Sequence, residues 1–139
     1  MNILTAFGSV NWIAVLVAFV AYTVLGGVWF TALFGKAYAA SLGRADAPRE
    51  KPSALFIAGP AVCTLVVTVT TALLMAALEI TTAGYAVVLA LVVGVGYLVA
   101  NTVNIAINPN MPRPFFYSLI SGSYHLVGIV LTALILTAF

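Results

Sequence analysis

The shortage that stands out in this 139-residue sequence is charge, since only 6% of its residues are Asp, Glu, Lys or Arg while 64% are hydrophobic. Soluble domains carry roughly 25% charged residues, so the lipid bilayer rather than water is the expected surrounding. The formal net charge of +2 is small, and no basic stripe with interleaved aromatic residues is present. The composition therefore excludes a nucleic-acid partner.

Cysteine and histidine are almost absent, with Cys63 and His125 as the single examples. One cysteine excludes an intramolecular disulfide and zinc-knuckle sites, and a lone thiol in an apolar run is most often a small core residue. One histidine without carboxylate neighbours makes a poor haem or metal site. The sequence predicts no cofactor and no metal. The apolar runs also offer no Asp, Glu or Lys as a second catalytic group, which weighs against an enzyme without deciding it.

Long apolar stretches dominate what is present. The first one lacks a basic leader and is too long for a signal peptide, so it is expected to stay in the membrane. Each stretch reaches the roughly 20 residues that a membrane-crossing helix needs, and the links after the second and third are short. The sequence predicts an all-α, integral membrane fold, an up-down antiparallel four-helix bundle that forms one domain over residues 1–139. The expected helices are 10–34, 53–78, 83–107 and 115–138.

The few cations give the expected orientation. All of them fall in the first and third loops, and none lies in the second loop or the tails: Lys36, Arg44, Arg49, Lys51 and Arg113. The positive-inside rule makes that side cytoplasmic. We therefore expect a multi-pass protein of the inner (plasma) membrane with both termini outside. In the first loop, a short helix after residue 34 is expected to stop at Gly43.

Polar side chains recur at helical spacing inside the apolar stretches. On the third stretch Tyr97, Asn101 and Asn104 are four and three residues apart, which places them on one face of a helix. His125 lies about ten residues into its stretch, roughly 15 Å deep and near the midplane. We expect these faces to converge in a polar intramembrane seam, open toward the cytoplasm. Its candidate members are Tyr22, Thr68, Tyr97, Asn101, Asn104, Ser121 and His125.

Three interpretations of His125 remain open. It either bonds Tyr97, Tyr22 or Ser121 across helices and holds the bundle together, at about 0.6 kcal/mol per bond, or handles a solute or proton, or ligates haem. Small residues at four-residue spacing on the first and third stretches also indicate close helix contacts, within the chain or with another copy. They include Ala14, Ala18, Gly26, Ala86, Ala90 and Gly94.

Several short motifs, taken in order, resemble the bacterial membrane family called domain of unknown function 1761. They are Asn-Trp at the entry to the first helix, Gly-x-x-Trp near its end, Gly-Lys directly after it, and Tyr-His in the fourth helix. Here they correspond to Asn11, Trp12, Gly26, Trp29, Gly35, Lys36, Tyr124 and His125. The resemblance implies a four-helix integral membrane protein and brings no established activity.

Three functions are compatible with these observations. The first is a non-enzymatic packing or accessory protein, acting as a homo-oligomer or as a subunit of a larger membrane complex. The second is an oligomeric channel or carrier that uses the seam around His125. The third is a membrane enzyme or haem binder that uses His125.

Overall fold

The computed structural model describes residues 3–48 and 51–139, so Arg49 of the cationic loop lies outside the described part. Within that part the regular elements are all helical. In chain order they are α1 (Ile3–Ala6), α2 (Trp12–Val28), the π-helix η1 (Trp29–Leu33), α3 (Gly35–Ser41), α4 (Ala54–Ala77), α5 (Ala83–Val93), the π-helix η2 (Gly94–Val99), α6 (Ala100–Ala106) and α7 (Pro114–Ala138).

Among the described residues, four helices are long and apolar enough to cross a membrane: Trp12–Leu33, Ala54–Ala77, Ala83–Ala106 and Pro114–Ala138. The first comprises α2 and η1, and the third comprises α5, η2 and α6. The bounds expected from the sequence differ from these by at most two residues. The protein is thus all-helical, with four apolar helices that fit a membrane protein.

Local chemistry explains where these helices begin and end. The Asn11 side chain caps α2 by accepting hydrogen bonds from the backbone amides of Ile13 and Ala14, at 3.1 and 3.2 Å. Pro114 stands at the start of α7, where its missing N–H costs nothing. Gly43 follows α3 with a φ of 69°, the left-handed conformation that ends helices.

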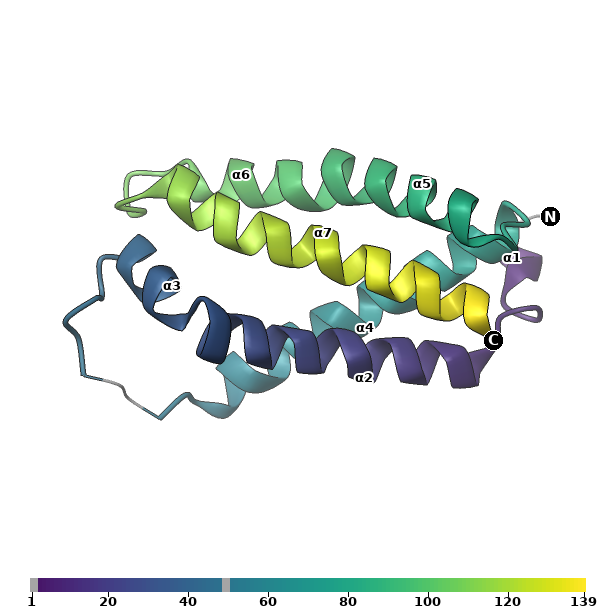
Figure 1. The fold of residues 1–139 in the computed structure, drawn as a ribbon, viewed down its shortest axis with the longest axis horizontal. Coiled ribbons are helices and arrows are strands. Elements are labelled where there is room, and N and C mark those ends of the chain that lie inside the picture. Colours follow the sequence, from purple (N-terminus) through teal and green to yellow (C-terminus); the bar gives the residue numbers. More distant parts are fainter. Residues whose placement is uncertain (1–2, 49–50) are drawn as a thin grey trace.

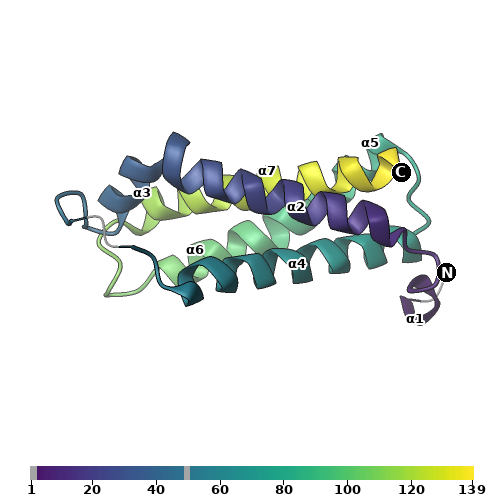
Figure 2. The ribbon, with the colours of Figure 1, turned by 90° about the horizontal axis from the view of Figure 1, so that it is seen from below.

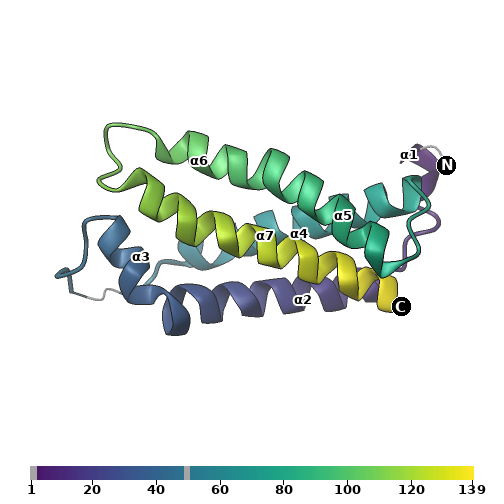
Figure 3. The same cartoon turned by 45° about the horizontal axis from the view of Figure 1, so that its top comes forward.

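Helix α7 is the centre of the bundle. It packs against α2, α4, α5 and α6, and 44% of an 18-residue stretch of its span is buried, compared with 17 to 22% for such stretches of the other three spans. Figures 1 and 3 show α7 between α2 on one side and α5 and α6 on the other. The remaining long helix, α4, lies behind this layer in Figure 1 and along the lower side of the molecule in Figure 2.

The two ends of the bundle differ. The N- and C-termini lie at one end, and α3 and the 107–113 turn lie at the other, which we call the loop end (Figure 1). Helix α4 crosses the others obliquely, so it packs along α2 and reaches α5 near the termini. At the loop end α4 and α6 make little or no contact, since α6 packs on α7 instead.

The apolar core occupies the half of the bundle near the termini, where α4, α5 and α7 meet. Its buried members are Met75, Ala86, Ala90, Ile129 and Ala133. The small side chains on α5 therefore bring helices of the same chain together, and Ala14 and Ala18 on α2 are fully buried as well. The small residues highlighted by the sequence are used within the chain.

Candidate functional site

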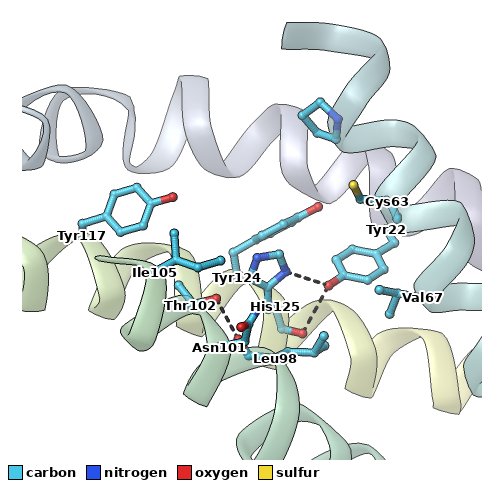
Figure 4. A pocket seen from close by; sticks show the side chains of 12 residues that line it. Tyr22, Cys63, Val67, Leu98, Asn101, Thr102, Ile105, Tyr117, Tyr124 and His125 are labelled. Atoms are coloured by element: carbon cyan, nitrogen blue, oxygen red, sulfur yellow. Dashed lines mark hydrogen bonds between the residues drawn. The ribbon is translucent and has the colours of Figure 1, made fainter. Parts of the chain in front are cut away.

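A cavity of about 300 Å³ lies in the half of the bundle toward the loop end, between α2, α4, α6 and α7. Figure 4 shows it from close by. Its lining mixes apolar groups with hydroxyl, thiol, amide and imidazole groups, and none of the lining residues is Asp, Glu, Lys or Arg. These residues are Tyr22, Pro60, Cys63, Thr64, Val67, Leu98, Asn101, Thr102, Ile105, Tyr117, Tyr124 and His125.

Helices α2 and α7 form the floor of the cavity. A tyrosine of each helix packs on a glycine of the other. The ring of Tyr22 from α2 occupies the space that a Cβ at Gly128 of α7 would need. In return Tyr124 of α7 lies over Gly26 of α2, where a Cβ would come within 2.8 Å of the Tyr124 hydroxyl. Each helix thus carries a tyrosine four residues before a glycine, so both rings are buried in the contact.

His125 is held by the Tyr22 side of this contact. The Tyr22 hydroxyl lies 3.3 Å from Nδ1 of His125 and 3.4 Å from the His125 carbonyl oxygen, as the dashed lines in Figure 4 show. No described residue bonds Nε2 of the ring. When Tyr22 donates to the carbonyl, Nδ1 carries the ring proton and Nε2 is an acceptor. When Tyr22 donates to Nδ1, Nε2 is a donor.

The walls come from α4 and α6, and their lining residues are more exposed than those of the floor. Cys63 on α4 is exposed, as is Asn101 on α6, whereas Tyr22 is only 1% exposed. The Thr102 hydroxyl donates to the Leu98 carbonyl at 2.7 Å, so its oxygen keeps the capacity to accept a hydrogen bond. The rim of the cavity therefore runs along α4 and α6.

Aromatic rings close the loop end of the site. Phe30 contacts both Tyr124 and Tyr38, with ring centroids 5.0 and 4.8 Å apart, and Tyr38 reaches Tyr117 at 5.8 Å. Burial, and then the neighbouring Tyr117 phenol, raise the pKa of Tyr38 above its ordinary value. Tyr38 is therefore a neutral phenol at physiological pH and adds no charge to the site.

The structure brings together only part of the seam that the sequence suggests. Tyr22, Asn101 and His125 line the cavity, and the His125 bond to Tyr22 is one of the three contacts considered for it. Thr68 is buried but donates to the Thr64 carbonyl, one turn away along α4. Ser121 is buried, its hydroxyl has no hydrogen-bond partner among the described residues, and it does not line the cavity.

Tyr97 and Asn104 require a correction, because they lie on the outer face of the third span. Tyr97 is 72% exposed, Asn104 is also exposed, and neither lines the cavity. The stripe that faces the cavity is Leu98, Asn101, Thr102 and Ile105, which shares only Asn101 with the predicted one. The π-helix η2 explains part of the offset, since its wider turn rotates the residues after it relative to a regular helix.

Four of the eight family-motif residues lie where α2 and η1 meet α7: Gly26, Trp29, Tyr124 and His125. The Trp29 indole N–H donates to the Ile120 carbonyl at 3.1 Å, and Gly26 accommodates Tyr124. Asn11 caps α2. The other motif residues lie nearer the ends: Trp12 stacks on Phe7, Gly35 begins α3, and Lys36 is exposed. The motifs thus mark the helix ends and the contact beneath the cavity.

The predicted seam omits four polar residues that line the cavity, Cys63, Thr64, Thr102 and Tyr117. A thiol in an apolar run is typical of a core, yet Cys63 is exposed at the rim. The threonines had a detectable signal, because Thr64, Thr68 and Thr71 recur at three- and four-residue steps and all three are buried. Tyr117 looks like an interfacial anchor from its position alone.

Comparison with protein families matches residues 13–137 to the family described as "Protein of unknown function (DUF1761)". The match covers most of the chain, which therefore belongs to that family. Comparison with curated proteins and with solved structures gives no match.

Proposed function

We propose that this member of the DUF1761 family is a membrane-embedded binding protein that holds a small uncharged molecule in the cavity beside His125. The observation that carries the proposal is the cavity itself, about 300 Å³ of space against the Tyr22–His125 pair. A helix bundle that works only by packing fills its interior, because helices in a membrane associate through close contacts.

The lining defines the chemistry of the ligand. A charged ligand would find no side chain of opposite formal charge among the lining residues, and an unpaired charge away from water is expensive. Nε2 of His125, the Asn101 amide and the Thr102 oxygen instead offer neutral donors and acceptors. Leu98, Val67 and Ile105 supply apolar contacts. A neutral molecule with one or two hydrogen-bonding groups on a small apolar body fits this lining.

The four spans form an up-down antiparallel bundle. We place it in the inner (plasma) membrane with both termini outside, because the described cations belong to α3, the loop after it and the 107–113 turn, which are at the loop end: Lys36, Arg44, Lys51 and Arg113. The cavity then lies in the cytoplasmic half of the bilayer. A carrier or a sensor would both use such a site.

The test compares two substitutions on neighbouring positions of α4. Cys63→Phe places a ring at the rim of the cavity, while Val62→Phe places the same ring on an exposed position that does not line it. Each protein is extracted gently from its own membrane and examined by native mass spectrometry. We expect the wild type and Val62→Phe to retain the same small molecule and Cys63→Phe to lose it.

Two outcomes would contradict binding in this cavity. One is a wild-type protein that carries nothing besides lipid, and the other is a molecule that Cys63→Phe retains as well as the wild type does. Either result would favour the packing or accessory function. An enzyme has less support, because the cavity lining brings no carboxylate or second imidazole to His125. No group of three or more His, Cys, Asp and Glu residues within the described chain could hold a metal ion.

A further inference from the structure

The outer face of the third span carries polar side chains that nothing in the described chain satisfies. Tyr97, Asn101 and Asn104 are all exposed, and none of them makes a hydrogen bond to a described residue. Asn101 and Asn104 lie three residues apart on α6 and share one helical face, and Tyr97 precedes them within the π-helix η2. We call Tyr97, Asn101 and Asn104 the polar face.

Depth makes the polar face costly for a single chain in lipid. Measured from the midpoint of the span Ala83–Ala106, Tyr97 lies roughly 4 Å from the membrane centre, Asn101 about 10 Å and Asn104 about 14 Å. The hydrocarbon extends to about 15 Å on either side. Lipid tails offer no hydrogen bonds there, and polar groups at such depths normally face another helix.

The same face allows another helix to approach closely. Gly96 and Ala100 are exposed beside Tyr97 and Asn101, and a Cβ placed at Gly96 would meet nothing within 4 Å. Two small residues four positions apart let helix backbones come near enough for short side chains to bond across them. Unlike Ala86 and Ala90 of α5, Gly96 and Ala100 are not covered by the described chain itself.

We propose that a second copy of this chain packs on the polar face, around a two-fold axis along the membrane normal. An amide both donates and accepts, so Asn101 and Asn104 can bond their own counterparts across such an axis. Every copy carries the polar face at the same depth in the membrane. The polar groups of two copies therefore lie at matching depths and have matching chemistry. Asn101 is also a lining residue of the cavity, so the second copy borders its rim.

Cysteine cross-linking in the membrane tests this contact. In a Cys63→Ala background, which removes the only native thiol, Tyr97→Cys places a thiol on the polar face. Val24→Cys is the control, because Val24 is 59% exposed on α2 and lies at about the same distance from the loop end of its span. Upon oxidation we expect Tyr97→Cys to form disulfide-linked dimers and Val24→Cys to stay monomeric.

A second measurement tests the amides without touching the cavity. Because Asn104 is exposed and does not line the cavity beside His125, Asn104→Leu should leave the internal packing intact. Dimerisation is measured by energy transfer between labelled copies in phosphatidylcholine vesicles over a range of protein-to-lipid ratios. We expect Asn104→Leu to raise the dimer dissociation constant about tenfold, since each polar contact between membrane helices contributes modestly. Asn104→Gln keeps an amide, so we expect its dissociation constant to lie closer to that of the wild type.

The results separate this inference from the proposed function. A wild type that is monomeric at every ratio, equal cross-linking at positions 24 and 97, or an unchanged dissociation constant for Asn104→Leu would overturn the dimer. Cross-links from Tyr97→Cys to a different polypeptide would overturn it as well, and would identify that protein as the partner. A monomer that still retains its small molecule contradicts only the dimer, and a dimer that binds nothing contradicts only the cavity.

Discussion

The helix pairs α2–α7 and α4–α6 border the same cavity, but only the first pair is in close contact. On α2 and α7, glycines lie directly beneath tyrosine rings, so the backbones approach and the rings fill the space between them. On α4 and α6, the lining residues are small or medium-sized and face each other across empty space. Close packing on one side and an open gap on the other produce a cavity with a firm floor and an exposed rim.

The difference shows what a buried tyrosine needs in a membrane helix. Tyr22 is almost completely covered, because a glycine lies under its ring and its hydroxyl has His125 as a partner. Tyr97 is the same residue type at a similar depth, but it has neither a facing glycine nor a partner within the described chain, and it points outward. For these two tyrosines, burial goes with a facing glycine and a hydrogen-bond partner, and it does not follow from the residue type alone.

Adding one methyl group to the floor should have the largest effect. A Cβ at Gly128 would overlap the Tyr22 ring, which is itself buried and cannot move aside. We expect Gly128→Ala to lower the free energy of unfolding by about 3 kcal/mol or more, the upper range for overpacking. Reversible unfolding in mixed detergent micelles measures this. A loss below 1 kcal/mol would mean that α2 and α7 are not in close contact.

Neighbouring glycines on α2 provide an internal control for the reciprocal contact. A Cβ at Gly26 would lie 2.8 Å from the Tyr124 hydroxyl, whereas a Cβ at Gly27 would meet nothing within 4 Å. Because the Tyr124 hydroxyl is the end of a side chain and can shift, we expect Gly26→Ala to cost about 1 to 2 kcal/mol. Gly27→Ala should be stabilising by about 0.5 kcal/mol, since alanine is the better helix former. The same unfolding assay compares them, and equal effects would contradict the contact.

Much of the fold is accessible from the sequence, and the reason is physical. A span must be long and apolar to cross lipid, so the four spans stand out in the composition, and their ends coincide with features such as Asn11, Gly43 and Pro114. These signals are local. They report on one helix at a time, which is why the bounds could be predicted to within two residues.

The candidate site was predictable only in part, because it depends on how each helix is rotated. Periodicity puts Tyr97, Asn101 and Asn104 on one inward face, but all three are exposed and only Asn101 borders the cavity. The rotation of the third span depends on the π-helix η2, and the rotations of α2 and α7 depend on the contacts of Tyr22 with Gly128 and of Tyr124 with Gly26. Neither feature can be read from a pattern of 3.6 residues per turn. Tyr22 and His125 were found because isolated polar residues deep in a span need partners.

Removing the Tyr22 hydroxyl tests the link between floor and cavity. Tyr22→Phe keeps the ring over Gly128 but leaves Nδ1 of His125 without its partner. We expect a loss of about 1 kcal/mol, between the average for a polar contact in a membrane and the cost of an unpaired buried group. A double-mutant cycle with His125→Phe isolates the bond. Additive losses in that cycle would show that the two side chains are not coupled.

The smallest effect is expected at Ser121, a predicted seam residue that the structure buries away from the cavity. Its hydroxyl has no hydrogen-bond partner in the part of the chain that the structure describes, so it contributes the cost of a buried polar group without the compensating bond. Ser121→Ala should leave stability unchanged or increase it by up to about 1 kcal/mol, because the methyl group keeps the packing and removes the unpaired oxygen. The unfolding assay and retention of the small molecule are measured together. A loss of stability would show that the Ser121 hydroxyl has a hydrogen-bond partner in the membrane. Loss of the bound small molecule at unchanged stability would show that Ser121 belongs to the binding site.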